Sequence, residues 1–405
     1  MKILFPNWKN FGFEDITEAL TQLGHTVVSY NDMPKNYRKD PRFVSVLKNY
    51  IHSEKIDLML TSNYFPVVSD ACQDADIPYV SWCYDSPLIL TYSKTVFHPC
   101  NYIFIFDSQM VLDLRALGVE HVYYMPMAVN AKRLAGMQAT AEQKKILDAD
   151  VSFVGSLYTE KHTLYDRMTE LDEHTKGYLE GIMKAQQLIY GASVLEDALT
   201  PDIIDKMYAV MPVQIAPDDL QDYRYIYANY FLCRKITQTE RTELLSLISQ
   251  AMPHMNTGSQ RKVSPFKLYT IEETPFLPLV QNMGTVHYLR EMPLVFQNSK
   301  INLNITLRSI KNGIPLRAMD IMGAGGFLLT NYQNDFNYHF EDGVDYVSFA
   351  SQDDMLDKIE YYLGHEKERC EIAQNGCNKV RSEHTYEKRL QEMLSIVEED
   401  LSGAH

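Results

Sequence analysis

The first 130 residues alternate short apolar segments with amphipathic ones, and this alternation restricts the possible folds more than any other feature of the chain. Short apolar segments bounded by turn residues are typical of strands, and longer segments with apolar residues three and four apart are typical of helices. This order predicts a parallel α/β sheet. Helices are expected near 14–23, 40–53, 66–75 and 108–117, and strands at 2–5, 26–30, 57–60, 79–82, 102–106 and 122–124.

Length and charge set the class of protein. A chain of 405 residues is long enough for two domains, and 45% hydrophobic with 22% charged residues is ordinary for a soluble globular protein. A formal charge of -15 argues against nucleic acid as the main partner, because phosphate backbones are bound by basic surfaces. One small phosphorylated ligand in a local basic pocket stays compatible with this charge.

Three further features predict a cytoplasmic location. No apolar run approaches the ~20 residues that cross a bilayer, so no transmembrane segment is expected. The apolar part of the first residues is also too brief for a signal peptide. The six cysteines form no CxxC pair and no disulfide-like framework, so they are expected to be reduced thiols. No sequence feature indicates an oligomeric state.

Composition shifts predict where the domains begin and end. Residues 1–130 form the first domain, and the polar stretch 131–150 is interpreted as a linker. The second domain covers 151–385, with a purely helical insertion at about 162–260 whose many tyrosines are expected to pack in a core. After the insertion, strands are expected to resume at 267–269 and 286–289. An amphipathic helix within 386–405 is a candidate for crossing back to the first domain.

The stretch 300–331 is the most informative part of the chain for function. Alternating apolar residues at its start predict a strand. Gly313 then marks a turn, and Pro315 fits the first turn of a helix, where its missing N–H would have no partner in any case. Gly325 lies where that helix ends, before the next strand begins.

Three cations of this stretch, Arg308, Lys311 and Arg317, fall within a span of ten residues. Beside a helix N-terminus they would make a local site for an anion such as a diphosphate. Asp320, one turn into the same helix, would accept hydrogen bonds from both ribose hydroxyls of a nucleotide. A solvated turn with scattered charges explains the same residues, and this stretch alone leaves the choice open.

Two glycine-containing turns follow predicted strands and are further candidates for ligand contact. At 151–156 a strand runs into Gly155 and Ser156 before a helix, an arrangement that directs backbone N–H groups at a phosphate. Gly12 follows the first strand, where a glycine lets the backbone approach a ligand closely. A single glycine is weak evidence for a ligand-binding loop.

Several runs of the sequence occur in a distinctive order: NITLRSIKNGIPLR, GAGGFLLTNY and FEDG near the C-terminus, and SWCYDSP and NYIFIFD nearer the N-terminus. Together they resemble the CgeB-like glycosyltransferases, the spore-maturation-protein group. The resemblance implies the GT-B fold, in which two Rossmann-like parallel-sheet domains face a cleft. It also implies that a nucleoside diphosphate-sugar binds to the C-terminal domain and an acceptor to the N-terminal domain.

The same resemblance bears on individual residues. Related GT-B enzymes place a donor-phosphate lysine about six residues after the glycine, which is Lys161 here. Many of them have arginine directly after that glycine, where this chain has Ser156, so more of the charge falls on Arg308 and Lys311. The C-terminal half resembles retaining enzymes, in which no enzyme base is strictly required.

Two polar side chains of the first domain are candidates for catalysis. Asp85 lies in the run SWCYDSP, directly after a predicted strand, where a carboxylate is able to take a proton from a sugar hydroxyl. An N-cap or Asx turn before Pro87 explains the same aspartate. His98, in a loop before the next strand, is able to hydrogen-bond a donor sugar, although a loop histidine more often has no special role.

No metal site and no cofactor are expected. The twelve histidines form no HxxxH or HExxH pair, no DxD pair follows a strand, and there is no GxSxG elbow. A nicotinamide dehydrogenase is excluded because the GAGG glycines end a helix, whereas the dinucleotide fingerprint opens one. A leaving diphosphate would then be stabilised by backbone N–H groups and cations.

These observations predict a metal-independent glycosyltransferase of the hexosyltransferase type, which moves a sugar from a nucleoside diphosphate-sugar to a hydroxyl of a glycan, protein or small molecule. Three alternatives stay open: a nucleotide-sugar epimerase, a hydrolase of the same fold, and a non-catalytic carbohydrate-binding protein. The expected donor-binding residues are Gly12, Gly155, Ser156, Lys161, Arg308, Lys311, Arg317, Asp320 and Gly325, and the expected catalytic residues are Asp85 and His98.

Overall fold

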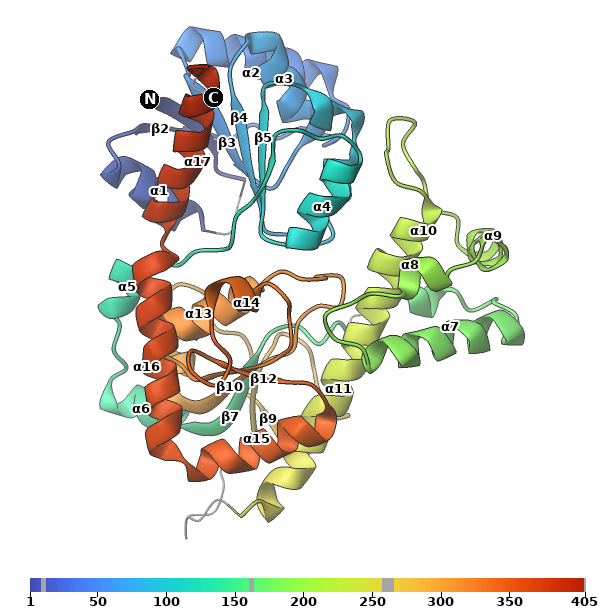
Figure 1. Cartoon of the computed structure of the whole chain (residues 1–405), viewed down its shortest axis with the longest axis vertical. Coiled ribbons are helices and arrows are strands. Elements are labelled where there is room, and N and C mark those ends of the chain that lie inside the picture. The colour runs from blue at the N-terminus through green and yellow to red at the C-terminus, as the bar shows by residue number, and fades with distance from the viewer. Residues whose placement is uncertain (9–11, 160–163, 257–265, 404–405) are drawn as a thin grey trace. The chain divides into compact units, whose positions relative to one another are not determined.

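The structure, a computed structural model, describes residues 1–8, 12–159, 164–256 and 266–403. These residues form two compact units (Figure 1). Unit 1 comprises Met1–Asn130, Ile215–Asp222 and Glu383–His405, and unit 2 comprises Ala131–Gln214 and Tyr223–Ser382. Each unit has its own six-stranded parallel sheet.

The sheet of unit 1 has the strand order β2-β1-β3-β4-β5-β6. The chain therefore moves outward from β1 to β2 and then returns to the other side of β1 with β3. This reversal between β1 and β3 is the point where ligands collect in open parallel sheets. Every residue of β3, β4 and β5 is buried, as expected for strands covered on both faces. The strands are β1 (Lys2–Pro6), β2 (Thr26–Tyr30), β3 (Leu58–Ser62), β4 (Tyr79–Cys83), β5 (Asn101–Ile105) and β6 (Val122–Tyr124).

Two helices of unit 1 begin at an aspartate whose side chain caps the helix. Asp40 accepts a hydrogen bond from the Phe43 N–H at the start of α2, and Asp107 accepts one from the Gln109 N–H at the start of α4. The predicted strands and helices of this region are confirmed to within two residues. The helices are α1 (Phe13–Gln22), α2 (Pro41–Glu54), α3 (Pro66–Ala75), η1 (Ile89–Tyr92), η2 (Lys94–Phe97), α4 (Ser108–Ala116) and the C-terminal α17 (Tyr386–Leu401), which packs on α1.

Eight residues from the middle of the chain, Ile215–Asp222, belong to unit 1 although the sequence places them within the helical insertion. The Lys94 N–H donates to the Asp218 carbonyl at 3.0 Å, and the Leu220 N–H donates to the Tyr92 carbonyl at 2.6 Å. Side chains add to these contacts, because Arg38 forms an ion pair with Asp219. The segment is therefore anchored to η1 and η2.

The sheet of unit 2 has the order β12-β11-β10-β7-β8-β9, so its reversal lies between β7 and β10. The predicted strand at 286–289 is wrong: the strand of this region is β9, and residues 286–289 form a loop and turn. Gly284, at φ 77°, follows β9 and helps to end it. The strands are β7 (Ala149–Val154), β8 (Phe266–Tyr269), β9 (Val280–Asn282), β10 (Ser299–Asn304), β11 (Leu328–Asn331) and β12 (Val347–Phe349).

Residues 131–150, interpreted above as a linker, fold into α5 (Ala131–Ala135), α6 (Ala141–Leu147) and the start of β7, within unit 2. The ammonium of Lys267 on β8 fixes the end of α6, since it donates to the carbonyls of Ile146 and Asp148 at 2.5 and 2.7 Å. The following strands are flanked by α12 (Met292–Asn298), α13 (Leu316–Ala324), α14 (Phe336–His339), α15 (Gln352–Gly364) and α16 (Glu366–Glu383).

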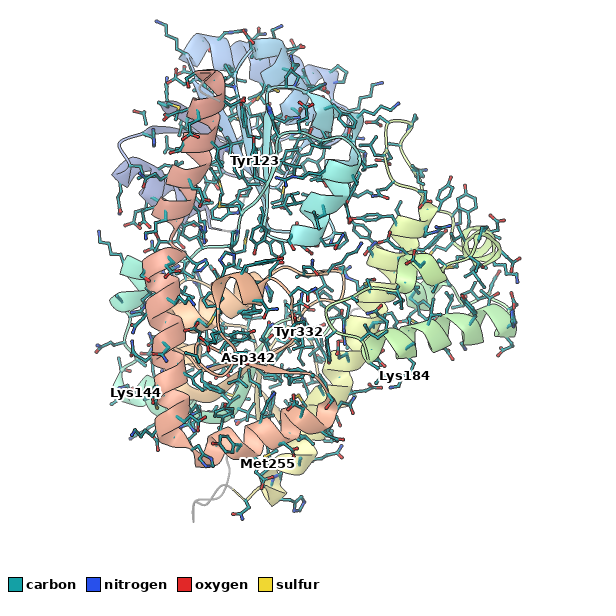
Figure 2. All side chains as sticks on the ribbon, viewed as in Figure 1. Tyr123, Lys144, Lys184, Met255, Tyr332 and Asp342 are labelled. Carbon is teal, nitrogen blue, oxygen red and sulfur yellow. The ribbon has the colours of Figure 1, made fainter. Side chains whose placement is uncertain are left out.

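The helical insertion has a core of its own. Leu179, Met207, Tyr227 and Phe231 are fully or almost fully buried within it, which confirms that part of the aromatic run packs internally. Its last helix, α11, continues into the sheet and contributes Leu244, Leu245 and Ile248 to the sheet core. Lys184 of the insertion is exposed, as is Lys144 of α6 outside it (Figure 2). The helices are η3 (Tyr165–Arg167), α7 (Glu173–Gln187), α8 (Leu195–Ala198), α9 (Pro201–Val210), α10 (Tyr223–Ile226), the π-helical η4 (Tyr227–Leu232), α11 (Cys233–Ala251) and η5 (Met252–His254).

Candidate functional site

In unit 2 several of the predicted site residues lie at the carboxyl ends of the strands. The loop after β7 begins at Gly155, and the loop after β10 carries Arg308 and Lys311 before α13 starts. These two strands are neighbours and flank the reversal of strand order. Ligands of open parallel sheets bind at this position.

The backbone of the loop after β7 is already hydrogen-bonded within the protein. Glu272, which follows β8, accepts from the N–H groups of Leu157 at 2.6 Å and Thr159 at 3.0 Å, and from the Ser156 hydroxyl at 3.1 Å. The Gly155 N–H donates to the Tyr269 carbonyl at 3.1 Å. The loop thus differs from the expected phosphate cradle, because a carboxylate of the same chain occupies its donors.

Glu272 is held in its charged form by these contacts. Burial alone would raise its pKa, but the hydrogen bonds from Thr270, Leu157 and Thr159 outweigh burial and lower the pKa below its ordinary value. Its two oxygens share the donors, since Thr270 and Leu157 donate to one oxygen and Thr159 to the other. Glu272 was not identified from the sequence, where it is one of two adjacent glutamates in a polar loop.

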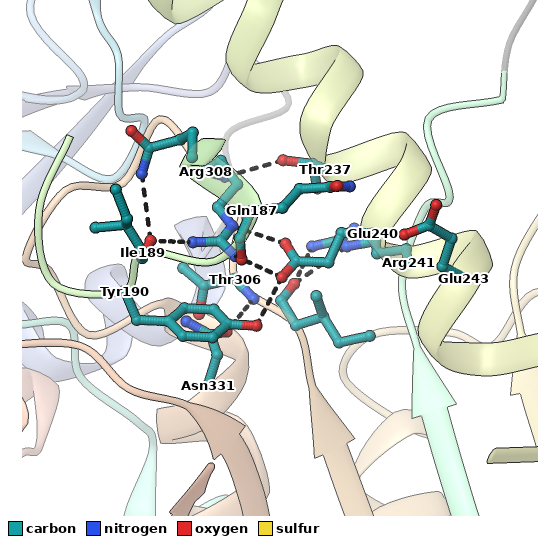
Figure 3. A network of polar contacts seen from close by, with 12 residues as sticks. Gln187, Ile189, Tyr190, Thr237, Glu240, Arg241, Glu243, Thr306, Arg308 and Asn331 are labelled. Carbon is teal, nitrogen blue, oxygen red and sulfur yellow. Dashed lines mark hydrogen bonds and ion pairs between the residues drawn. The ribbon is translucent and has the colours of Figure 1, made fainter. Parts of the chain in front are cut away.

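Arg308, predicted to bind a diphosphate, is instead buried in contacts within the protein (Figure 3). Its guanidinium forms two hydrogen bonds with Glu240 of α11, at 2.6 and 2.7 Å, and lies 4.1 Å from the ring centre of Tyr190. It also donates to the carbonyls of Gln187 and Ile189, both at 2.9 Å. The side chains of Arg308 and Glu240 are only 7% and 6% exposed. Arg308 therefore fastens the insertion to the loop after β10 and is not presented to a diphosphate.

A second buried arginine, Arg241, was missed by the sequence analysis. It donates to the carbonyl of Ser156 after β7, and to the carbonyl of Ile305 after β10 at 3.1 Å from Nε. Its guanidinium also lies over the ring of Tyr158. Arg241 thus joins the ends of the two strands that flank the reversal. The sequence signal is its spacing, since Arg241 falls on the same buried face of α11 as Leu244 and Leu245.

The side chains of Lys311 and Arg317, the other predicted cations of this region, are more exposed to solvent than that of Arg308. Lys311 pairs with Glu196 at 2.9 Å, and Arg317 pairs with Asp320 at 3.3 Å. Their side chains are 20% and 29% exposed. Asp320 also accepts a hydrogen bond of 2.7 Å from the hydroxyl of Tyr288. The structure therefore brings Arg317 and Asp320 together, with Tyr288 as a partner that the sequence did not indicate.

The N-terminus of α13 offers backbone donors beside these side chains. Within the part of the chain that the structure describes, the N–H groups of Gly313, Ile314 and Leu316 form no hydrogen bond. The first N–H groups of a helix attract anions through their partial positive charge. Gly325 lies at the opposite end of α13, where φ is 89° and it caps the helix, so it is not near these donors.

In unit 1 Asp85 lies at the carboxyl edge of the sheet, two residues after β4. One carboxylate oxygen accepts a hydrogen bond of 2.8 Å from the side-chain amide of Asn63, which follows β3. The side chain remains exposed to solvent. Protein atoms nevertheless surround the carboxylate, and this desolvation raises the pKa of Asp85.

His98 lies at the other edge of the same sheet, three residues before β5. Its Nδ1 is 3.1 Å from the hydroxyl of Ser69 and 3.9 Å from the carboxylate of Asp70. These three side chains do not form a catalytic triad, because both contacts use the same nitrogen and Ser69 is fully buried. The structure therefore separates His98 from Asp85.

The two remaining predicted residues are Lys161 and Gly12. Lys161 lies outside the described residues. Gly12 belongs to unit 1 and has φ 74°, and a Cβ atom there would lie 3.0 Å from the Tyr386 hydroxyl. A glycine at this position is thus explained by backbone conformation and by the close approach of α17.

Among the described residues no three His, Cys, Asp or Glu side chains lie close enough to hold a metal ion, and no helix is long and apolar enough to span a bilayer.

Comparison with known proteins places this geometry in context. Residues 258–395 match a family described as "Glycosyl transferase-like". None of the curated proteins matches the chain. Its structure is similar to that of the Anabaena protein HepE in complex with UDP and glucose, with a TM-score of 0.58 and 10% identity over 98% of this chain and 99% of the other.

Two further solved structures are similar over nearly their whole lengths. Sucrose-phosphate synthase from Thermosynechococcus elongatus has a TM-score of 0.57 and 9% identity, with 100% of each chain covered. A glycosyltransferase from Rickettsia africae has a TM-score of 0.51 and 10% identity, with 99% of this chain and 98% of the other covered. The chain has the GT-B fold, with two Rossmann-like parallel sheets.

Proposed function

We propose that this protein is a glycosyltransferase that uses a nucleoside diphosphate-sugar as donor. The observation that carries the proposal is the family match over residues 258–395, because this range contains β8 to β12 and α13, which form most of the candidate site of unit 2. Structures with the same fold include HepE in complex with UDP-glucose. Fold alone does not fix a reaction, so the proposal rests on the site as well.

The donor diphosphate is proposed to bind at the N-terminus of α13. Gly313, Ile314 and Leu316 supply N–H groups there, and Arg317 and Lys311 supply positive charge nearby in the sequence. Each charge-assisted hydrogen bond contributes roughly 1.5–3 kcal/mol, so several of them are able to stabilise a leaving diphosphate without a metal ion. The loop after β7 then forms a wall of the site, held in shape by Glu272 and Arg241.

Asp320 is proposed to accept the ribose hydroxyls of the donor. It lies one turn into α13, and its carboxylate is 10% exposed. In the structure its oxygens accept from Tyr288 and Arg317, so bound ribose would replace or share the Tyr288 hydrogen bond. Arg317 would remain beside the carboxylate.

The acceptor is proposed to bind to unit 1, with Asp85 hydrogen-bonded to its reacting hydroxyl. Asp85 has an exposed carboxylate at the edge where ligands of parallel sheets bind. His98 is proposed to be structural instead, because its ring lies at the other edge, against the buried Ser69. Membership of the CgeB-like group remains part of this proposal and rests on the sequence runs quoted above.

The first test is ligand binding, followed by product analysis. Thermal shift and calorimetry with UDP, GDP, dTDP and their sugar conjugates, with and without EDTA, should identify one preferred base and the same affinity in both conditions. Incubation with the preferred donor should then release nucleoside diphosphate only when an acceptor extract is present. Release of free sugar without acceptor would indicate a hydrolase, a changed sugar would indicate an epimerase, and no nucleotide binding would refute the proposal.

A further inference from the structure

We propose that Asn63 is a positioning residue of unit 1, which orients the Asp85 carboxylate toward the hydroxyl of the acceptor. This inference rests on the proposed function. Asn63 follows β3, and Asp85 lies two residues after the neighbouring strand β4. Both are therefore at the carboxyl edge of the sheet, beside the reversal of strand order between β1 and β3.

Both polar atoms of the Asn63 side-chain amide form hydrogen bonds with the loop that carries Asp85. Its Nδ2 donates to Oδ2 of Asp85 at 2.8 Å. Its Oδ1 accepts from the backbone N–H groups of Tyr84 at 3.0 Å and Asp85 at 3.3 Å. One buried amide thus fixes both the backbone and the carboxylate of the candidate residue.

The backbone of Asn63 is unusual in a way that a turn alone does not explain. Its φ is 69°, in the left-handed region that most side chains avoid. Lys55 and Asp76 have similar angles, but they cap the ends of α2 and α3. Asn63 instead follows a strand, and glycine would satisfy the backbone equally well. The amide group is what asparagine adds there, and that amide holds Asp85.

The second oxygen of Asp85 is placed to meet a ligand. Among the described residues Oδ1 of Asp85 forms no hydrogen bond, and the side chain is exposed. Its titratable neighbours are Tyr84 and Cys83, and Asp107 is linked to the same loop through the Ser86 hydroxyl at 3.1 Å. No cation competes for the carboxylate among these groups. A hydroxyl that approaches Oδ1 therefore meets an acceptor whose other oxygen is already fixed.

Two variants separate this role from a purely structural one. Asn63→Gly keeps the backbone conformation accessible and removes only the amide, whereas Asn63→Asp keeps the size and places a second carboxylate against Asp85. Asp76→Gly is the matched control, because it changes another left-handed residue of unit 1, at the end of α3, away from the Asp85 loop. Asp85→Asn assigns the Asp85 signal in a protein with carbon-13-labelled aspartate.

The readouts are the steady-state constants of sugar transfer and the NMR titration of the Asp85 carboxyl. We expect Asn63→Gly to lower kcat about tenfold while the donor KM changes less than twofold, since a general base contributes at least roughly a hundredfold. The Asp85 pKa should rise in Asn63→Gly and rise further in Asn63→Asp, and the acid limb of the pH–rate profile should follow. Asp76→Gly should resemble the unmodified protein in every measurement.

An unchanged kcat in Asn63→Gly, or an equal loss of donor affinity, would overturn the proposal. An unchanged Asp85 titration would also overturn it, because Asn63 would then not control the carboxylate. If the unmodified protein transfers no sugar from any donor, the proposed function fails. The titration still decides in that case whether Asn63 sets the state of Asp85.

Discussion

The guanidinium of Arg308 and the carboxylate of Glu240 form a buried pair with two hydrogen bonds, of 2.6 and 2.7 Å. The pair joins the loop after β10 to the helical insertion, and Tyr190 completes it with a hydrogen bond of 2.8 Å to Glu240. A cation that the sequence presents as a ligand-binding group is therefore part of the internal structure of unit 2.

Loss of one partner of this pair should be strongly destabilising. Arg308→Met leaves Glu240 buried without its partner, and breaking a buried pair in this way costs about 3–5 kcal/mol. The combined change Arg308→Met with Glu240→Leu should cost less, because no uncompensated charge remains. Urea unfolding monitored by circular dichroism measures both variants. Asp202→Asn, which breaks the exposed pair with Lys206, is the control and should change the free energy of unfolding by less than about 1 kcal/mol.

Asp320→Asn should weaken nucleotide binding about tenfold or more, since each hydrogen bond from ribose to a charged acceptor contributes roughly 1.5–3 kcal/mol. Calorimetry with the preferred nucleoside diphosphate measures the change. The control is Asp345→Asn, because Asp345 is equally buried at 9% exposure and pairs with Lys379 just before β12, at the other edge of the sheet. Equal affinity in the Asp320 and Asp345 variants would remove the ribose role.

Tyr288→Phe tests whether ribose replaces the tyrosine hydroxyl. The variant removes the hydrogen bond of 2.7 Å from the Tyr288 hydroxyl to one oxygen of Asp320, so a ligand that needs this oxygen no longer competes with that hydroxyl. Nucleotide affinity should rise up to about fivefold, which corresponds to roughly 1 kcal/mol for one net hydrogen bond. A lower affinity would instead show that Tyr288 supports the bound state of Asp320.

Glu272→Gln should change the pH dependence of stability. The pKa of Glu272 is lowered from 4.5 in the folded protein, so its contribution is present above about pH 4.5 and is lost as the pH falls through the folded-state value. The variant places an amide NH2 against N–H donors, so it should be less stable than the unmodified protein at pH 7. Urea unfolding from pH 7 to pH 3 should show this difference shrink in acid. A difference that stays constant with pH would contradict the assignment.

Much of the fold was predictable because its signals are local. Strands such as β2 and β6 and the helix α3 occur at their expected residues, since their apolar pattern and flanking turns lie within about ten residues of each other. Asp320 and Arg317 were also found from local spacing, as they lie three residues apart on α13.

The partners of the other site residues were not predictable for the opposite reason. Glu240 lies 68 residues from Arg308, Glu196 lies 115 from Lys311, and Glu272 lies 115 from Leu157. A single sequence shows that a cation or a glycine loop is present, but not that a distant carboxylate satisfies it. The same applies to Asn63, whose importance depends on a contact between the ends of two strands.

The anchoring of Ile215–Asp222 to η1 and η2 affects how the protein is taken apart in experiments. The chain passes from one unit to the other four times, after residues 130, 214, 222 and 382. A fragment ending at residue 130 would lack both α17, which covers α1, and the partners of Lys94 and Arg38. Neither unit can therefore be obtained by truncating the chain at one position. Expression of unit 1 alone requires its three segments to be joined by short artificial linkers.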